Sequence, residues 1–519
     1  MAGTKTLREL TREEVAKHNT EKDLWIIVDS YVYDITKFVG LHPGGEGVLL
    51  QVAGKEATEQ FYGLHRHEVM EKFGPRYIIG QIIGEMPKLQ LQRSGEFSKV
   101  PYAESPFVQG RPSPYYKESH VKFRQALRKF YDEELLPDAA SADAMGEAPD
   151  LEIYQKMGQA GILATRMGPG PHLKLVPKLP GGVSPDEFDY FHELVGHEEL
   201  TRLGIYGYAE GLASGMVIGL PPVMVFGPNW MKEKIIPEVL MGNKRICLAI
   251  SEPTVGSDVA GLATTAVKTA DGKHFIVNGV KKWITNGTFS DYFTTAVRTG
   301  GPGMGGISML LIERTEGVST KIIKTSGTAS AGTAYVTFDN VKVPVENLIG
   351  GENKGFQVIM ANFNHERWSM VVGCARAARL VTEECFKWAN QRKVFGKALI
   401  EQPVIRFKLA EMVAGVEATQ GWLESITYQM TKMSYKEQSL HLAGTIALLK
   451  YNATRMTQRV SDNAVQIFGG RAITKGGMGR IIENFQARNK FGAILGGSEE
   501  IMADLGIRQT LKTFPNTRL

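Results

Sequence analysis

The chain has 519 residues, of which 43% are hydrophobic and 22% charged, with a formal net charge of +5. A chain of this length exceeds what one hydrophobic core organises, so two or three domains are expected. The charge is small for the length and no dense basic block is present, which excludes nucleic acid as a partner.

The cysteines and the chain ends bear on the compartment. Cys247, Cys374 and Cys385 form no closely spaced pair, which excludes a disulfide framework and a cysteine zinc site and favours a reducing intracellular compartment. No apolar run is expected to reach the 18 residues of a membrane span. Residues 1–7 lack the apolar stretch of a signal or transit peptide. Residues 516–519 end in Thr-Arg-Leu, a degraded form of a peroxisomal address, so the cytoplasm or the peroxisome is expected.

The first motif along the chain is His42-Pro43-Gly44-Gly45, which His65 follows. Two imidazoles at both axial positions of a haem iron leave no site for oxygen or substrate, which favours electron transfer over haem catalysis. The glycines allow a turn with positive φ and a close approach of the backbone to a flat macrocycle. The surrounding pattern predicts strands at 25–28, 31–33 and 77–79, and helical wall residues at 48–50 and 61.

Residues 5–84 resemble the cytochrome b5 family, and in particular the haem domains of flavin-haem lactate dehydrogenases. The resemblance implies haem b, with His42 and His65 as the iron ligands, and an external electron donor or acceptor at this domain. His67 is the alternative ligand. Counted from Phe61, the family places the ligand four or five residues later, which favours His65; His67 and His18 are expected to be surface histidines.

The pattern changes three times after the haem module. Residues 85–117 are rich in Pro, Gly, Ser and Gln, which predicts a linker that lets two modules reorient. Apolar residues recur at helical spacing in 118–245 and again in 351–519, whereas 246–350 contains strand-like alternation at 274–278, 292–297 and 334–338. This order predicts an α/β/α three-part enzyme.

Two segments of the predicted β region, Ala249–Asp258 and Asn278–Gly287, resemble the flavin-contacting segments of the acyl-CoA dehydrogenase family. An isoalloxazine ring needs an apolar or aromatic face, hydrogen bonds at its polar rim and anchors for the pyrophosphate. The resemblance implies FAD. It assigns Ile250, Ser251, Trp283 and Thr285 to the ring, and Gly256 and Ser257 to the pyrophosphate. The family prefers a small residue at Val255, where the valine could narrow the space beside the phosphates.

Two later segments extend the resemblance to residues ~115 to 519. Gln391–Gly396 resembles the segment in which Arg392 and Phe395 contact the flavin dinucleotide across a subunit interface. Gln466–Gly470 resembles the segment at the adenosine end, with Gln466, Gly469 and Gly470 in contact. The planar donor fork of arginine suits phosphate. The resemblance implies an α+β multidomain protein, with a helical domain, a central β domain and a C-terminal four-helix bundle after the haem domain, assembled as a homodimer or homotetramer with FAD at the interface.

The usual position of the catalytic base is occupied by glycine. Family members abstract the α-proton of an acyl-CoA with a glutamate while the β-hydride leaves for the flavin, and such a base needs a desolvated carboxylate. Most members carry it just before a Gly-Thr-Ser-Gln/Glu-Ile run, which here is Leu495–Ile501 and places Gly496 at the base position. Ser498 and Glu500 match positions that contact flavin.

An earlier helix offers a replacement base. Isovaleryl-CoA and long-chain acyl-CoA dehydrogenases carry the glutamate there, directly before an arginine, and Glu366-Arg367 matches that arrangement. The resemblance implies Glu366 as the base, with Asn364 and Arg367 in contact with the thioester ligand. Glu499 and Glu500 are the alternative bases.

The leading interpretation is an FAD-dependent dehydrogenase that converts an acyl-CoA to a trans-2-enoyl-CoA and passes electrons to its own haem. The alternatives are an oxidase whose flavin is reoxidised by oxygen, and an acyl-CoA-binding sensor with an inert flavin. Met360 and Phe363 are candidates to line the acyl end, and the chain length and branching of the acyl group stay open.

Overall fold

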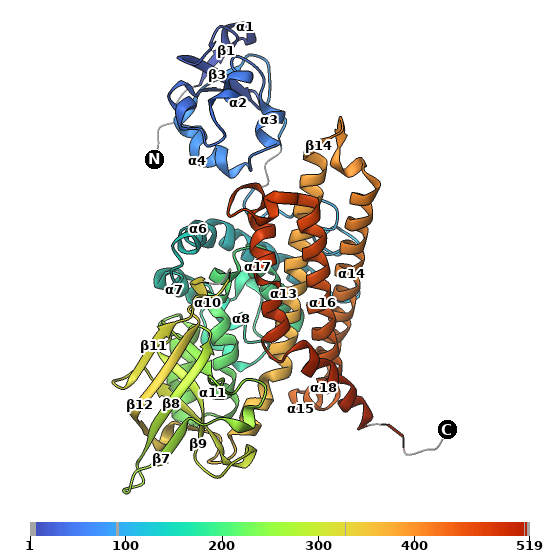
Figure 1. Cartoon of the computed structure of the whole chain (residues 1–519). Helices are drawn as coiled ribbons and strands as arrows, with labels where there is room; N and C mark the ends of the chain where they lie inside the picture. The colour runs from blue at the N-terminus through green and yellow to red at the C-terminus, as the bar shows by residue number, and fades with distance from the viewer. Residues whose placement is uncertain (1–6, 90–92, 327–328, 513, 516–519) are drawn as a thin grey trace. The chain divides into compact units, whose positions relative to one another are not determined.

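The structure is a computed structural model that describes residues 7–89, 93–326, 329–512 and 514–515 (Figure 1). It divides into two compact units, and each is described by itself. One unit contains residues up to 93 with 387–406 and 468–480, and the other contains 94–386, 407–467 and 481–519. The predictions for residues 1–6 and for the terminal Thr-Arg-Leu fall outside the described residues.

The N-terminal part of the first unit is a five-stranded sheet in the order β1-β5-β4-β3-β2. The strands are β1 (Arg8–Leu10), β2 (Asn19–Thr20), β3 (Asp23–Val28), β4 (Tyr31–Asp34) and β5 (Ile78–Ile82). Because side chains alternate across a strand, Leu24, Ile26 and Val28 of β3 enter one hydrophobic cluster while Trp25 and Ile27 enter another. The predicted strands at 25–28 and 31–33 lie in β3 and β4.

Short helices lie against one face of this sheet and carry the predicted haem residues. They are α2 (Glu46–Gln51), α3 (Thr58–Tyr62) and α4 (Glu68–Tyr77), preceded by α1 (Arg12–Val15). Leu49, Phe61 and Met70 pack onto the cluster that contains Leu24 and Val28. The predicted strand at 77–79 begins one residue later, because Tyr77 ends α4.

Much of the predicted linker is packed against the second unit. Glu104 is 2% exposed and accepts a hydrogen bond from Arg128 Nη2 at 3.1 Å, and Arg376 donates to the carbonyl of Ala103 at 2.7 Å. The buried carboxylate of Glu104 therefore holds the stretch from Ser94 to Lys117 in place. Its lack of helical or strand periodicity reflects an irregular but ordered path.

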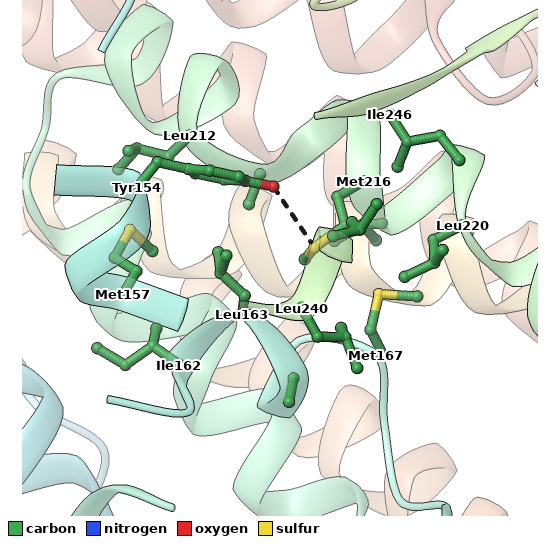
Figure 2. Close-up of a cluster of buried hydrophobic side chains, with 14 of the residues drawn as sticks. Tyr154, Met157, Ile162, Leu163, Met167, Leu212, Met216, Leu220, Leu240 and Ile246 are labelled. Atoms are coloured by element: carbon green, nitrogen blue, oxygen red, sulfur yellow. Dashed lines mark hydrogen bonds between the residues drawn. The ribbon is translucent and has the colours of Figure 1, made fainter. Parts of the chain in front are cut away.

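Helices form the first domain of the second unit. They are α5 (Glu118–Phe130), α6 (Leu136–Met145), α7 (Leu151–Gln159), α8 (Ile162–Thr165), α9 (Tyr190–Arg202), α10 (Tyr206–Gly219), α11 (Pro221–Phe226) and α12 (Asn229–Leu240). Figure 2 shows how Tyr154, Leu163 and Met216 meet in the core between α7, α8 and α10, where the Tyr154 hydroxyl lies 3.7 Å from the Met216 sulfur.

One expectation about apolar segments needs correction. Tyr206–Phe226, which spans α10 and α11, has the length and composition of a membrane span, with a mean hydropathy of 1.5 over its most apolar window. Of that window, 56% is buried inside the fold. Leu212, Met216 and Leu220 belong to the core cluster in Figure 2, so packing inside the helical domain accounts for the apolar composition.

The central domain is an eight-stranded sheet. Seven strands follow the order β11-β12-β8-β7-β9-β10-β13, and β6 pairs in parallel with β9. The strands are β6 (Ile246–Ala249), β7 (Thr265–Lys268), β8 (His274–Ile284), β9 (Tyr292–Arg298), β10 (Ile307–Glu313), β11 (Val318–Ile322), β12 (Ala334–Pro344) and β13 (Leu348–Ile349). The three predicted strands all lie within β8, β9 and β12.

The C-terminal domain is built on long helices. They are α13 (Gly355–Gln391), α14 (Pro403–Lys432), α15 (Tyr435–His441), α16 (Ala443–Phe468), α17 (Arg480–Ile494) and α18 (Glu499–Leu511). Trp368 of α13, Leu423 of α14 and Leu449 of α16 share one core cluster, and a β-carbon on Gly492 of α17 would lie 3.3 Å from Cys374 of α13. These contacts hold four helices side by side in a bundle (Figure 1).

Candidate active site and cofactor-binding sites

Glu366 lies on α13 and is 8% exposed. Asn362, one turn earlier on the same helix, donates a hydrogen bond to Glu366 Oε1 at 2.9 Å. Burial raises the pKa of Glu366 to about 7, although the Asn362 hydrogen bond and the neighbouring cations Arg367 and His365 act in the opposite direction. Glu366 is thus a desolvated carboxyl that loses its proton near neutral pH.

Arg367 connects the Glu366 helix to the loop that contains Gly496. Its Nε donates to the Gly496 carbonyl at 3.1 Å, and its Nη1 donates to Asn364 Oδ1 at 3.4 Å. The guanidinium carbon also lies 5.3 Å from the ring centre of Phe363. The structure therefore brings Asn364, Arg367 and Gly496 together, and Arg367 is a neighbouring charge of Glu366.

The backbone at Gly496 is unsuited to a larger residue. Its φ is +62°, in the left-handed region, and a β-carbon there would lie 2.7 Å from the sulfur of Met370. Lys450, on α16 and 1% exposed, donates to the carbonyls of Leu495 and Gly497 on either side. Two cations, Lys450 and Arg367, hold three consecutive carbonyls of this loop.

The alternative bases after Gly496 have other surroundings. Glu499 accepts a hydrogen bond from Gln458 at 2.7 Å and lies 3.6 Å from Arg455 Nη1, so its carboxylate is engaged with α16. Glu500 is exposed in the first turn of α18, where the Ser498 hydroxyl accepts a hydrogen bond from the Ile501 amide at 3.5 Å. Glu499 is thus buried but held by Gln458 and Arg455, and Glu500 is exposed, whereas burial raises the pKa of Glu366 to about 7.

A buried ion pair fixes the loop that follows β6. Lys281 is fully buried, and its Nζ donates to the Ile250 carbonyl at 3.0 Å and to Glu252 Oε1 at 2.8 Å. Glu252 also accepts from the amides of Ala263 and Thr264. These buried hydrogen bonds hold the backbone at Ile250, and the Ser251 carbonyl accepts a further bond from the Lys282 amide at 2.8 Å.

Trp283 stands at the exposed end of β8 in an unusual backbone conformation. Its φ is +66°, which is rare for a bulky residue, and 49% of it is exposed. The turn that follows is locked by Asn286, which accepts from the Gly215 amide and donates to the carbonyls of Glu210 and Ala331. Such outliers cluster at ligand sites. Thr285, between the two, is half-buried.

The predicted pyrophosphate contacts, Gly256 and Ser257, lie on an exposed turn. Nothing among the described atoms lies within 4 Å of a β-carbon built on Gly256. Val255 closes the turn through paired backbone hydrogen bonds with Glu252, at 2.9 and 3.2 Å. Its side chain packs in the core cluster that also holds Leu262, which places its bulk away from the open side of the turn.

A second group of predicted flavin residues belongs to the first compact unit. Phe395 and Gly396 form the tip of the hairpin between β14 (Lys393–Val394) and β15 (Lys397–Ala398), and Phe395 is 95% exposed with φ +51°. Arg392 and Phe395 line an open groove of about 640 Å³.

The glycines of the adenosine-end segment follow α16 in the same unit. Gly469 has φ +61°, and both it and Gly470 are exposed. Phe468 stacks on Trp388 at 5.3 Å, which ties this segment to the hairpin side of the unit. Gln466 is exposed on the last turn of α16 and belongs to the second unit.

The two predicted haem ligands face each other. The ring centres of His42 and His65 lie 6.0 Å apart, and two imidazoles that bind one metal ion at about 2 Å have ring centres roughly this far apart. His42 Nδ1 lies 3.0 Å from the Gly45 carbonyl and His65 Nδ1 lies 3.1 Å from the Phe61 carbonyl. Such bonds fix the tautomer and leave Nε2 of each ring for the metal.

His67 is engaged elsewhere, since its Nδ1 lies 2.8 Å from the Tyr62 hydroxyl. Apolar side chains next to both predicted ligands are exposed, with Leu41 at 71% and Leu64 at 50%. Opposed imidazoles flanked by apolar surface suit a flat, largely apolar macrocycle, so the residues present fit a haem.

One further group of side chains, His120, Asp189 and His192, has donor atoms close enough to share a metal ion. Hydrogen bonds explain why these three side chains lie close together. Asp189 caps α9 by accepting from the amides of Phe191 and His192, and its Oδ1 lies 2.9 Å from His120 Nε2. The group joins α5 to the start of α9.

Sequence reasoning missed the two buried lysines. Lys281 sits on the inward-facing row of β8 with Phe275 and Val277, and a charged residue at a core-facing position calls for a buried partner. That signal was available. Lys450 has no such signal in the sequence, because its carbonyl partners lie 45 and 47 residues further along the chain.

Comparison with known proteins identifies the modules. Residues 11–83 match a cytochrome b5-like heme/steroid binding domain. Residues 117–243, 247–341 and 353–511 match the N-terminal, middle and C-terminal domains of acyl-CoA dehydrogenase. The chain is 42% identical over 426 residues to acyl-CoA dehydrogenase apdG of Emericella nidulans, covering 81% of this chain and 97% of that protein. This chain belongs to the acyl-CoA dehydrogenase family.

Other members of the family support the assignment. Acyl-CoA dehydrogenase AFT10-1 of Alternaria alternata is 40% identical, covering 80% of this chain and 96% of that protein. The crystal structure of an acyl-CoA dehydrogenase from Geobacillus kaustophilus superposes with a TM-score of 0.67 at 29% identity, covering 77% of this chain and all of that one. The predicted fold class is confirmed: a small cytochrome b5-like domain precedes the helical, β and helical domains of an acyl-CoA dehydrogenase enzyme.

Proposed function

We propose that this acyl-CoA dehydrogenase converts an acyl-CoA to a trans-2-enoyl-CoA with Glu366 as the base, and that the electrons leave singly through its own haem domain. The observation that carries the proposal is the buried Glu366 carboxyl, with its pKa raised to about 7, beside Arg367 and the glycine loop. A general base works best when its pKa lies near the working pH.

Different residues of the chain have different roles in this reaction. The Cα–H bond breaks as its proton passes to Glu366, and the β-hydrogen departs with its electron pair as hydride. FAD, when bound, would supply the hydride acceptor, and a b-type haem, held by His42 and His65 when bound, would supply a one-electron acceptor. The Asn362 hydrogen bond occupies Oε1 of Glu366, which leaves Oε2 to receive the proton. Asn364 and Arg367 are the proposed thioester contacts.

The proposed flavin site rests on several features of the chain. Ile250 and Ser251 are fixed by the Lys281 ion pair, and Trp283 is exposed in a strained conformation. Phe395, almost fully exposed at a hairpin tip, and Arg392 beside it support contact with a group outside their own protomer. We therefore propose that two copies share each FAD in a homodimer or homotetramer.

The deciding experiment is anaerobic mixing of the oxidised holoenzyme with a panel of acyl-CoAs while flavin and haem absorbance are followed together. A substrate is expected to bleach the flavin first and reduce the haem afterwards. A His65→Ala variant should lose haem reduction and keep flavin bleaching, whereas His67→Ala, the same change two residues away, should keep both.

Other outcomes point to other functions. A flavin that bleaches beside a haem that stays oxidised contradicts the haem route. If peroxide then forms in equal amount to product when oxygen is admitted, undiminished in His65→Ala, the enzyme is an oxidase. A flavin that no acyl-CoA bleaches contradicts the dehydrogenation itself.

A further inference from the structure

A fully buried acid, Glu193 of α9, lies against the helix that carries Glu366. Glu193 Oε1 lies 2.8 Å from His365 Nε2 of α13 and 3.3 Å from His197 Nε2 of its own helix. The exposure of the Glu193 side chain is 0%. An ionised carboxylate in such a place must have a counter-charge, because an unpaired buried charge is strongly unfavourable.

The counter-charge resides on His365 rather than on His197. Burial alone would lower the pKa of His365, but the Glu193 carboxylate outweighs it and raises that pKa above its ordinary value. Burial lowers the pKa of His197 to about 4, and Arg166 acts in the same direction, so His197 is neutral at pH 7. The shorter distance and the direction of the pKa shift both assign the counter-charge of Glu193 to His365.

The His365 ring is held by packing as well as by charge. It stacks on Trp368 with ring centres 5.6 Å apart, and Tyr190 of α9 meets it edge-on at 6.3 Å. Trp368 in turn donates a hydrogen bond from its ring nitrogen to Thr427 of α14 at 2.9 Å. Trp368, Tyr190 and Glu193 thus contact the His365 ring from three sides. These contacts fix the position of the ring and of the charge that it carries.

His365 directly precedes Glu366 in the chain. We propose that Glu193 and His365 are a positioning pair for the base: their buried ion pair fixes the turn of α13 that carries Glu366 and keeps a positive charge beside its carboxylate. The inference rests on the proposed role of Glu366 as base. Neither residue of the pair is assigned a contact with substrate or flavin.

The groups that face this turn come from several elements, and few of them titrate near neutrality. They are Tyr190, Glu193 and His197 from α9, Arg166 from the end of α8, Tyr435 from α15, and Asn362 and Arg367 from α13 itself. Burial raises the pKa of Tyr190 and Tyr435, and both arginines stay charged. Glu366, with its pKa raised to about 7, is the carboxyl on this turn that changes charge near neutral pH.

A titration of the Glu366 carboxyl that needs no turnover tests the pair. In the holoenzyme, the infrared C=O band of the protonated carboxyl is assigned to Glu366 as the band that Glu366→Gln removes, and its midpoint is measured against pH. His365→Gln keeps a hydrogen-bond donor but loses the charge, so the midpoint should rise by about 0.5 to 1 pH unit. His197→Gln, the same change on the other partner of Glu193, should leave it in place.

The Glu193→Gln variant gives the second arm. Without the acid, burial lowers the pKa of His365 and disfavours its charged form, so the midpoint should rise in the same direction as in His365→Gln. The double variant should shift no further than either single variant, because both remove one charge pair. Circular dichroism and melting temperature identify any variant that fails to fold.

Three results would overturn the pair: an unmoved midpoint in His365→Gln, an equal shift in His197→Gln, or additive shifts in the double variant. A parallel stopped-flow measurement of flavin reduction by acyl-CoA should show the same displacement of its pH profile. If no acyl-CoA reduces the flavin of the parent enzyme, the proposed function fails, while the infrared midpoints still decide the pairing.

Discussion

Glu366 combines a carboxyl oxygen fixed by a hydrogen bond with a pKa near neutral pH. Because burial raises that pKa to about 7, the carboxyl is protonated and inactive as a base at lower pH. The rate of flavin reduction by acyl-CoA should therefore rise with pH through about 7 and level off above it. The Glu366→Gln variant keeps a side-chain oxygen for the Asn362 hydrogen bond and should lose about 10²–10⁴-fold in that rate.

The measurement is anaerobic stopped-flow at a series of pH values, with flavin content as the control. Because the substitution retains shape and hydrogen bonding, the flavin should stay bound in full. A variant that reduces its flavin at the parent rate would show that another group takes the proton, and Glu499 and Glu500 would be the next to replace.

Gly496 shows why the base cannot simply return to the position it occupies in most family members. A β-carbon at Gly496 meets the Met370 sulfur at 2.7 Å, in a backbone with φ +62°. A Glu366→Gln/Gly496→Glu double variant should therefore remain inactive in flavin reduction. Gly496→Ala alone should lower the free energy of unfolding by about 1 kcal/mol or more, as measured by denaturant titration. Recovery of activity in the double variant would contradict this account.

The sequence predicted the residues that carry their own chemical signature and missed those that act through the backbone. Glu366-Arg367 is recognisable because it matches one arrangement of the family. Gly496 is recognisable because it departs from the motif in which most members carry the base. Lys450 and His365 did not, since their roles depend on carbonyls and an acid brought near by folding. An isolated charged residue in a helix is otherwise best interpreted as a solvated one.

At the scale of elements, the Lys281 ion pair joins β8 to the loop after β6. Replacing Lys281 with Met leaves Glu252 charged and buried, which should lower the free energy of unfolding by about 3 to 5 kcal/mol. The Ile250–Ser251 backbone loses its anchor, so the flavin content of the purified protein should fall. Denaturant titration and the ratio of flavin to protein absorbance measure both effects.

A matched control for that variant is Lys268→Met on the neighbouring strand β7. Lys268 pairs with Glu352 at 2.8 Å, but its side chain is 43% exposed, and exposed pairs contribute about 1 kcal/mol or less. Flavin content should be unchanged in this variant. Equal losses in the two variants would show that burial of the pair is not what holds the loop.

Sequence periodicity predicted elements well where they are regular and poorly where they are not. The alternation of β8, β9 and β12 and the helical repeats of the C-terminal domain gave the order of domains. The segment 85–117 has no such repeat, which predicts a linker, yet from Ser94 onward it is fixed by the buried Glu104 and by Arg376. A single buried ion pair leaves no periodic trace.

At the scale of the whole molecule, the order of segments predicts an α/β/α three-part enzyme after a small N-terminal module. The haem and the flavin are predicted by the motifs that resemble known families. The length of Tyr206–Phe226 was not recognised, because Gly and Pro interrupt its apolar residues although its mean hydropathy is high. Association of two copies depends on exposed surfaces, which sequence periodicity does not predict. Phe395, 95% exposed at a hairpin tip, is the surface residue that the proposed shared flavin site uses.

Shared flavin sites predict complementation between two inactive variants. If one copy supplies Glu366 and Trp283 to a site while its partner supplies Arg392 and Phe395, then Glu366→Gln and Arg392→Ala damage the same site from opposite subunits. In a mixed dimer one of the two sites has both native residues. Coexpression at equal levels should therefore restore about a quarter of the parental number of active sites, because half of the dimers are mixed and half of their sites are intact.

The control for complementation pairs Glu366→Gln with Trp283→Ser. Both residues are proposed to serve the site of their own subunit, so every site in the mixed dimer carries at least one lesion and activity should stay at the level of the variants alone. Flavin reduction by acyl-CoA in doubly tagged, purified hybrids gives the readout. No recovery in the Arg392→Ala pair would place all the flavin contacts on one subunit and leave the exposure of Phe395 to be explained by a different partner. Recovery in the control pair would show that Glu366 and Trp283 reach one site from different subunits.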